Sequence, residues 1–220
     1  MILQNLYQLE YEYWSKERLV CGVDEVGRGC LAGPVVTAAA MLHQNVFHDL
    51  LIDSKKLSPK NLLLMHDWLM NHCSFSVAIA SNTTIDQHNI YKTTQMMMKQ
   101  ALLNLLTKEN NNPDLIIIDA MPLSLENTGF ENITMKSLTQ AESKSASVAA
   151  ASIIAKVTRD KIITRLASSF ADYGFEKHKG YATALHQQSL TKFKPSIIHR
   201  QTFLKNFLTE KNHEQQSIFC

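Results

Sequence analysis

The chain has 220 residues, of which 45% are hydrophobic and 19% are charged, and its formal net charge at pH 7 is +2. This composition is that of an ordinary soluble globular protein, and the length allows one sizeable core or at most two small domains. No window reaches the roughly 20 uncharged apolar residues of a membrane helix, and the N-terminus carries acids where a signal peptide would carry lysines. We therefore expect a cytoplasmic protein that does not contact membranes.

In the N-terminal third of the chain, the sequence pattern predicts three strands and one helix. Apolar runs over residues 19–24 and 34–42 predict two buried strands, joined as a hairpin by a glycine-rich turn. Ser58 followed by Pro59 predicts a helix that begins there and continues to about Asn71, because serine caps a helix and proline fits its first position. The sequence SFSVAIA alternates like a strand over residues 74–80.

The remaining elements predict a layered fold. Residues 84–107 form a helical pattern rich in methionine and leucine, and residues 114–119 form a buried strand that ends on an acid. Residues 142–167 predict a helix whose small side chains would let it lie very close to a sheet. Short helices with an irregular connection around Pro195 are expected over 172–208. This order predicts an α/β layer fold with a mixed sheet in one continuous domain.

Cysteine spacing and charge distribution narrow the possibilities further. The four cysteines (Cys21, Cys30, Cys73 and Cys220) lack a paired spacing, so we expect reduced, mostly buried thiols and no zinc site. Residues 155–211 hold eleven Lys or Arg but only four Asp or Glu. Such an excess is either a solvated basic face or a surface that contacts phosphates, and charge alone leaves both open.

Four acids lie where apolar elements begin or end: Asp24, Glu25, Asp119 and Glu142. Adjacent strand ends would bring these side chains together, and clustered carboxylates repel one another unless a cation is present. Oxygen ligands without His or Cys favour Mg²⁺ or Mn²⁺, and two such ions are the usual apparatus of phosphodiester hydrolysis. Any one strand-end acid alone is more often a cap or a surface charge. The prediction therefore depends on the whole set, and on Glu25 directly following Asp24.

The glycine-rich turn GRGCLA, residues 27–32, formally fits the dinucleotide-binding fingerprint. That motif must open a helix, whereas Gly33-Pro34 here leads into a strand pattern. A phosphate-binding P-loop is also excluded, because no Lys-Ser or Lys-Thr follows. Two interpretations stay open: a structural tight turn, or a turn whose bare backbone contacts a ligand while Arg28 binds a phosphate.

Five sequence blocks in order resemble the ribonuclease HII family: GVDEVGRGCLAGPVV, DSKKLS, SVAAASIIAKVTRD, HKGYATALH and IHRQTF. The similarity extends from about Leu19 to Phe207. It implies a ribonuclease H-like α/β fold, a mixed central β-sheet flanked by helices, with a C-terminal helical extension. We expect a single domain over residues 1–220, with a catalytic core over about 17–167 and the extension over about 168–210.

The resemblance also implies an activity. Members of this family are metal-dependent endonucleases that hydrolyse the RNA strand of RNA–DNA hybrids and cut at ribonucleotides embedded in duplex DNA. The implied cofactor is Mn²⁺ or Mg²⁺, with two ions during catalysis. The implied partners are RNA–DNA hybrids and ribonucleotide-containing duplex DNA, and we expect a monomer.

Residue by residue, Asp24, Glu25 and Asp119 match the family's metal-binding carboxylates. The tripeptide Gly27, Arg28 and Gly29, together with Tyr181, matches the residues that sense the ribose 2′-hydroxyl. Lys55 and Lys56 lie in a polar loop suited to phosphate contacts, or are ordinary solvated lysines. Five cations are expected along the duplex backbone: Lys177, Lys179, Lys192, Lys194 and Arg200. Three histidines are expected to be polar surface or structural residues: His178, His186 and His199.

The sequence departs from the family pattern at two places. The fourth carboxylate is usually an aspartate after lysine-glycine, but here it is Glu142 in Gln-Ala-Glu-Ser, closer to the sister ribonuclease HIII. Glu142 reaches one methylene further and is expected to ligate with altered metal geometry. Asp119 is followed by Ala120-Met121-Pro122 rather than by glycine-asparagine. Two alternatives therefore stay open: a catalytically silent hybrid-binding protein, and a ribonuclease HIII-like specificity that ignores single ribonucleotides.

Overall fold

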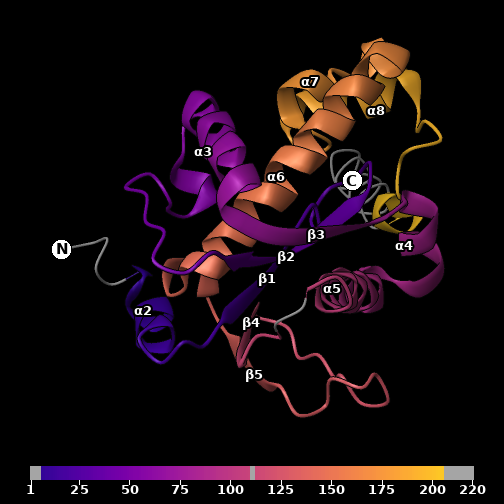
Figure 1. Ribbon diagram of the computed structural model, residues 1–220. Helices are drawn as coiled ribbons and strands as arrows, with labels where there is room; N and C mark the ends of the chain where they lie inside the picture. Colours follow the sequence, from indigo (N-terminus) through magenta and orange to yellow (C-terminus); the bar gives the residue numbers. More distant parts are fainter. Residues whose placement is uncertain (1–5, 110–111, 206–220) are drawn as a thin grey trace, which may run out of the picture. The chain divides into compact units, whose positions relative to one another are not determined.

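The structure is a computed structural model that describes residues 6–109 and 112–205 (Figure 1). The chain divides into two compact units. We call one the sheet unit, made of Met1–Val26, Val36–Ile79 and Thr94–Arg159, and the other the helical unit, made of Gly27–Val35, Ala80–Thr93 and Asp160–Cys220. The expected division into a core and an extension stays a prediction. No helix in the described part of the chain is long and apolar enough to cross a membrane.

A five-stranded mixed sheet has the order β3-β2-β1-β4-β5. Strand β1 (Val20–Val26) pairs antiparallel with β2 (Val35–Leu42) and parallel with β4 (Leu115–Asp119), which confirms the predicted hairpin and buried strand. Strand β3 (Cys73–Ala80) forms one edge. Strand β5 (Thr134–Leu138) forms the other edge, parallel to β4, and was not predicted because its side chains are mostly exposed and polar.

Helices cover both faces of this sheet. On one face, α5 (Ile90–Leu106) buries Met98 and Leu102 against apolar residues of β1, β2 and β4. The opposite face is covered by α6 (Ala146–Ala167) (Figure 1). Val148 of this helix packs with Val20 and Ile117. Met96 of α5 lies outside this core, since 47% of it is exposed.

Helix α6 lies directly on β1, as its small residues predicted. A Cβ atom added to Gly22 would lie 2.2 Å from the backbone carbon of Ser147 and 2.2 Å from the nitrogen of Val148. Such distances are far inside van der Waals contact, so only glycine allows this approach. The fully buried Ala146 and Ala149 complete the close packing.

One predicted helix is confirmed and another is divided in two in the structure. Helix α3 (Pro59–His72) begins as predicted, with the Ser58 hydroxyl accepting a hydrogen bond from the Asn61 N–H at 3.2 Å. Residues 84–107 form two helices instead of one. Helix α4 (Asn82–His88) and helix α5 are separated by Asn89, whose φ of 61° cannot continue a right-handed helix.

The start of α6 is set by a buried acid from a helix that was not predicted. Glu10 of α2 (Gln8–Trp14) accepts hydrogen bonds from the Ser145 hydroxyl at 2.6 Å and from the Ser147 N–H at 2.9 Å. These contacts satisfy donors that a helix N-terminus leaves unpaired. The helix therefore begins at Ala146, and Glu142 lies before it in the short 3₁₀ helix η2 (Ala141–Ser143).

The helical unit has the short helices that the sequence predicted. They are η3 (Ser168–Tyr173), α7 (Phe175–His178) and α8 (Ala184–Phe193), followed by an irregular segment around Pro195. Residues 206–208 of the predicted tail lie outside the described residues. Cys21, Cys30 and Cys73 are buried and form no disulfide, as expected, and Cys220 also lies outside the described residues.

Candidate active site

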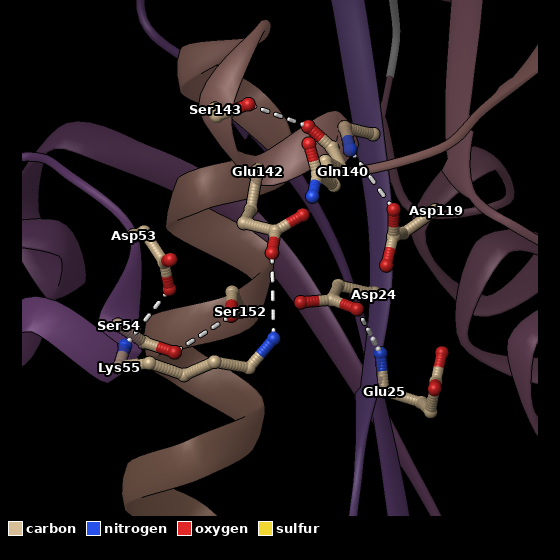
Figure 2. A network of polar contacts seen from close by, with 11 residues as sticks. Asp24, Glu25, Asp53, Ser54, Lys55, Asp119, Gln140, Glu142, Ser143 and Ser152 are labelled. Atoms are coloured by element: carbon tan, nitrogen blue, oxygen red, sulfur yellow. Dashed lines mark hydrogen bonds and ion pairs between the residues drawn. The ribbon is translucent and has the colours of Figure 1, made fainter.

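Acidic side chains occupy the carboxyl ends of three neighbouring parallel strands. In the register of β1 and β4, Val23 lies opposite Ile118, so Asp24 and Asp119 follow at the same edge. Asp119 in turn lies opposite Leu138 of β5, and the chain reaches Glu142 four residues later. Figure 2 shows these carboxylates around one region of the sheet edge. The sheet thus brings Asp24 and Asp119 to the same edge, and Glu142 lies on the segment that follows β5.

The fold makes a negative charge on Asp24 costly. Only 6% of Asp24 is exposed, and its Oδ1 accepts a hydrogen bond from the Glu25 N–H at 2.7 Å. Burial, and then the nearby carboxylates of Glu25 and Asp119, raise its pKa to about 8, although the Ser152 hydroxyl lowers it in part. A group with these neighbours favours either a proton or a metal cation.

Asp119 is tied to the segment that carries the fourth acid. Its Oδ1 accepts a hydrogen bond from the Ala141 N–H at 2.9 Å, one residue before Glu142. Two residues beside these acids adopt left-handed backbone, Ala120 with φ 50° and Gln140 with φ 54°. Non-glycine residues in that region cost on the order of 1 kcal/mol each, so the loops store strain next to the acids.

Glu142 has one paired and one unpaired oxygen. Its Oε1 lies 3.4 Å from the Lys55 Nζ, while its Oε2 is buried and has no hydrogen-bond partner among the described residues (Figure 2). Burial lowers the pKa of Lys55, but the Glu142, Asp53 and Asp24 carboxylates outweigh it, so that pKa is raised. A buried oxygen without a partner is expensive and is a candidate ligand atom.

The lysine loop is anchored by serine contacts that sequence reasoning missed. Ser54 begins the 3₁₀ helix η1 (Ser54–Lys56), and its Oγ lies 2.9 Å from the Oγ of Ser152 on α6. Asp53 caps the same turn by accepting from the Lys55 N–H at 2.9 Å. The one sequence signal for this contact was Ser152, a polar residue within the alanine-rich stretch that forms α6. Lys55 lies at Glu142, whereas Lys56 is exposed.

The donor set fits a hard divalent cation, although the side chains are not gathered around one point. Within residues 6–109 and 112–205, no group of three or more His, Cys, Asp or Glu is arranged to hold a metal ion. The acids nevertheless offer only oxygen ligands. One of them is the Glu142 Oε2, which has no hydrogen-bond partner among the described residues, and another is the Asp24 carboxylate, whose pKa is strongly raised. Such a set suits Mg²⁺ or Mn²⁺.

The predicted recognition residues belong to the helical unit, where residues 27–35 form what we call the glycine loop. Gly27 has φ 94°, a conformation that requires glycine, whereas Gly29 is exposed and a Cβ added there would meet no atom within 4 Å. Cys30 forms a β-bridge with Tyr181, and the Leu31 N–H donates to the Gly180 carbonyl at 2.9 Å. The loop and Tyr181, which is 37% exposed, are therefore held together.

A buried histidine chain supports Tyr181. The Nδ1 of His186 lies 2.9 Å from the Tyr181 carbonyl and must therefore carry a proton, so its Nε2 accepts from the Nε2 of His199 at 3.0 Å. The Nδ1 of His199 in turn accepts from the Ser196 N–H at 2.9 Å. Burial lowers the pKa of His186 and of His199 to about 4, which keeps the chain neutral. Of the two roles expected for these histidines, surface or structural, the structure therefore supports the structural one.

One member of the expected basic tail is misplaced by sequence reasoning. Lys177, Lys192 and Lys194 are exposed, and the Lys179 Nζ donates to the Thr164 hydroxyl at 2.8 Å. Arg200, in contrast, is fully buried, so its prediction as a duplex backbone contact is wrong. The sequence pattern could not distinguish a buried arginine from an exposed one.

Comparison with known proteins gives consistent matches. The family model described as Ribonuclease HII matches residues 21–206. A Ribonuclease HII of Caldicellulosiruptor saccharolyticus is 41% identical over 93% of this chain and 97% of its own length. A Ribonuclease HII of Lactobacillus johnsonii is 41% identical over 91% of this chain and 76% of its own. Among solved structures, the RNase HII of Archaeoglobus fulgidus, solved in complex with PCNA, is 27% identical, with a TM-score of 0.67 over 83% of this chain and 94% of that one.

Proposed function

The chain belongs to the ribonuclease HII family and is a ribonuclease H, and from this premise we propose that it cuts the RNA strand of RNA–DNA hybrids and also cuts at single ribonucleotides embedded in duplex DNA. The observation that carries the proposal is the position of Asp24, Asp119 and Glu142 at the carboxyl ends of three adjacent parallel strands. Ligands of open α/β sheets bind at that edge. A protein that only bound hybrids would not need buried acids there.

The four acids would hold divalent metal, Mn²⁺ or Mg²⁺, in a site for two ions. Metal bound there supplies the charge that activates a water molecule and stabilises the leaving oxygen in phosphodiester hydrolysis. The chain itself orients the ligands: the Glu25 N–H binds the Asp24 carboxylate, and the Ala141 N–H binds Asp119. Lys55 pairs with Glu142 through an ammonium group on a side chain that is 79% exposed. The same group is therefore accessible to a substrate phosphate, and Lys56 is proposed as a second phosphate contact.

The glycine loop is proposed to recognise the ribose 2′-hydroxyl, together with Tyr181. Gly29 supports this because its φ is ordinary and a side chain there would meet nothing, so packing within the described residues does not require glycine. A missing side chain then serves a ligand that must approach the backbone closely. The 2′-hydroxyl is the group by which a protein distinguishes RNA from DNA. The proposed partners are hybrids and ribonucleotide-containing duplex DNA, bound by a monomer.

The metal assignment is tested with three labelled duplexes: a continuous RNA–DNA hybrid, a DNA duplex with one ribonucleotide, and an all-DNA duplex. Each is incubated with the protein in Mg²⁺, Mn²⁺ or EDTA. We expect cleavage of the first two with metal only, and loss of cleavage in Asp119→Asn. Asp114→Asn is the matched control, because Asp114 lies just before the same strand at its opposite end and pairs with Arg18.

The same assay separates the alternatives. Binding of hybrids without any cleavage would identify a catalytically silent protein. Cleavage of the continuous hybrid but not of the single-ribonucleotide duplex would indicate ribonuclease HIII-like specificity, which is the alternative that Glu142 raises. Equal activity of Asp119→Asn and the parent would refute the metal assignment.

The recognition assignment is tested with Tyr181→Ala. We expect this variant to lose at least about fivefold more kcat/KM on the single-ribonucleotide duplex than on the hybrid, since one buried unpaired polar group costs about 1–3 kcal/mol. A continuous hybrid offers many 2′-hydroxyls and so alternative registers. Tyr91→Ala is the matched control, because Tyr91 is exposed to a similar extent, at 46%. Equal losses on both duplexes would make Tyr181 a general packing or duplex contact.

A further inference from the structure

The side chain of Arg200 makes five hydrogen bonds to carbonyl oxygens of the helical unit. Its guanidinium donates to the carbonyl oxygens of Gly27 at 2.6 Å, Arg28 at 2.8 Å, Gly33 at 3.0 and 3.1 Å, and Pro34 at 3.2 Å. All four carbonyls belong to the glycine loop. A single planar fork therefore binds both ends of that loop.

The position of Arg200 is itself fixed by α4. The Asn82 amide donates to the carbonyls of Ile197 at 2.9 Å and His199 at 3.1 Å, just before Arg200 in the chain. Asp86 accepts from the backbone N–H groups of Gln201 and Thr202, both at 2.9 Å. The backbone of Arg200 also donates to the Leu31 carbonyl at 2.8 Å. The backbone segments that precede and follow Arg200 are thus both fixed by hydrogen bonds to α4.

Stability alone is a weak explanation for this arrangement. Arg200 is fully buried, and a buried charge is expensive to desolvate even when it is well hydrogen-bonded. Replacing buried ion pairs by apolar groups of similar volume is often neutral or stabilising in proteins. A cation that binds four carbonyls of one loop therefore points to a role in the geometry of that loop.

The carbonyl contacts determine where the opposite side of each peptide points. Every described peptide bond is trans, and in a planar trans peptide the carbonyl and the following N–H point in opposite directions. Because the Gly27 and Arg28 carbonyls point to Arg200, the N–H groups of Arg28 and Gly29 point away from it. Two consecutive donors are thereby oriented together at the exposed Gly29.

We infer that Arg200 is a positioning residue for ribonucleotide recognition, which fixes the direction of the Arg28 and Gly29 N–H groups by binding four carbonyls of the glycine loop. This inference rests on the proposed function, since it assumes that the loop recognises the 2′-hydroxyl. It assigns no contact between Arg200 and substrate. Its consequence is that discrimination between RNA and DNA at the cut site depends on a buried residue that follows the loop by 165 or more positions in the chain.

The test uses Arg200→Lys, which keeps the positive charge but cannot span four carbonyls. The measured quantity is kcat/KM on the single-ribonucleotide duplex divided by kcat/KM on the continuous hybrid. We expect this ratio to fall at least about tenfold, the range for lost hydrogen bonds to a charged group. Arg18→Lys is the matched control, because Arg18 is largely exposed and lies outside both proposed sites. A purely structural role would lower activity on both duplexes and leave the ratio unchanged.

A binding measurement in EDTA gives a readout that needs no catalysis. The parent protein should bind the single-ribonucleotide duplex more tightly than the all-DNA duplex, and Arg200→Lys should lose that preference. If Arg200→Lys does not fold by circular dichroism, Asp86→Ala loosens the same segment, and we expect a fall of at least about twofold in the cleavage ratio, as for one hydrogen bond. An unchanged ratio in a folded variant would overturn the inference.

Failure of the premise is distinguishable from failure of the inference. A parent protein that cleaves hybrids but ignores the single ribonucleotide overturns the proposed recognition, and this inference with it. A parent that discriminates, with an Arg200→Lys variant that discriminates equally well, overturns the inference alone.

Discussion

Polar groups are satisfied in opposite ways at the acidic strand ends of the sheet unit and in the glycine loop of the helical unit. At the strand ends, like charges lie close together, the pKa of Asp24 is raised to about 8, and the Glu142 Oε2 is buried without a partner among the described residues. In the helical unit, a buried arginine donates to four carbonyls and the histidines form a neutral chain.

This difference indicates that the two regions would favour ligand binding for different physical reasons. Acids that repel one another are stabilised when a cation binds, which is the property that the proposed metal site requires. Donors whose directions are fixed by satisfied contacts lose little entropy on binding, which is the property that the proposed recognition by the glycine loop requires. The two regions should therefore respond differently to substitution, to metal and to pH.

The largest expected effect is on catalysis and stability together at Asp24. Asp24→Asn should reduce cleavage by more than about 100-fold, which is the upper end of the loss when a group that only hydrogen-bonds to a metal ligand is removed. The same variant should be more stable than the parent in EDTA. Because the folded pKa of Asp24 is raised from 3.8 to about 8, its contribution to stability is complete below pH 3.8 and is lost as the pH rises through 8.

Thermal unfolding across pH measures this trade-off. The melting temperature of Asp24→Asn in EDTA should exceed that of the parent by several degrees at pH 8–9, since 1 kcal/mol corresponds to about 2–4 °C in a chain of this size. The difference should shrink toward pH 4, where the parent carboxyl is protonated. A lower melting temperature for the variant at every pH would contradict the account of strained, like-charged acids.

Glu142 should be next in size of effect. We expect Glu142→Gln to slow hydrolysis by about 10–100-fold, because an amide is a poor ligand for a hard divalent ion and Lys55 loses its ion pair. Glu142→Asp should retain appreciable activity with a changed preference between Mg²⁺ and Mn²⁺. Steady-state cleavage of the continuous hybrid in each metal measures both. If Glu142→Gln matches the parent, the site has only three functional carboxylates.

Two glycines sharpen the comparison between the regions. Gly29→Ala should leave stability within about 0.5 kcal/mol of the parent, because a Cβ there meets no atom within 4 Å. It should nevertheless lower cleavage of the single-ribonucleotide duplex by about tenfold or more. Gly22→Ala, in contrast, should destabilise the protein by about 3 kcal/mol or more, since its Cβ would overlap the backbone of Ser147. Urea unfolding and cleavage assays on both variants separate packing from recognition.

The histidine chain should give the helical unit the opposite pH dependence. Burial lowers the pKa of His186 and His199 from 6.5 to about 4, so their contribution to stability is present above pH 6.5 and is lost as the pH falls toward 4. His186→Asn should reduce the slope of stability between pH 6.5 and 4, whatever its effect on absolute stability. Urea midpoints at several pH values measure the slope. A parent slope of zero in this range would contradict the neutral chain.

The smallest expected effect concerns backbone strain beside Asp119. Ala120 has φ 50°, where glycine is favoured, so Ala120→Gly should stabilise the protein by a few tenths to about 1 kcal/mol. Ala78→Gly, at a buried strand position, is a suitable contrast and should destabilise. Urea unfolding measures both. Destabilisation by Ala120→Gly would mean that the alanine methyl group contributes more than its backbone costs.

The sequence correctly predicted those elements whose type is decided by residues within the same short segment. The caps at Ser58 and the apolar run before Asp119 gave the correct element types, since capping and continuous burial act within a few residues. Strand β5 escaped prediction because an exposed edge strand has no apolar alternation. The predicted single helix over 84–107 was wrong because Asn89 breaks it through its backbone conformation.

The sequence by itself determined the chemistry: the types of acid at the strand ends, the glycine-arginine-glycine turn, and membership of a known family through five ordered blocks. Only the tertiary structure decided which polar groups are buried and what they contact. Arg200 looked like one more cation of a basic tail, yet it is buried against four carbonyls. Glu142 looked like part of a helix, yet the buried Glu10 makes the helix begin four residues later. Burial and partner choice depend on residues more than a hundred positions apart, and no local sequence pattern encodes such distances.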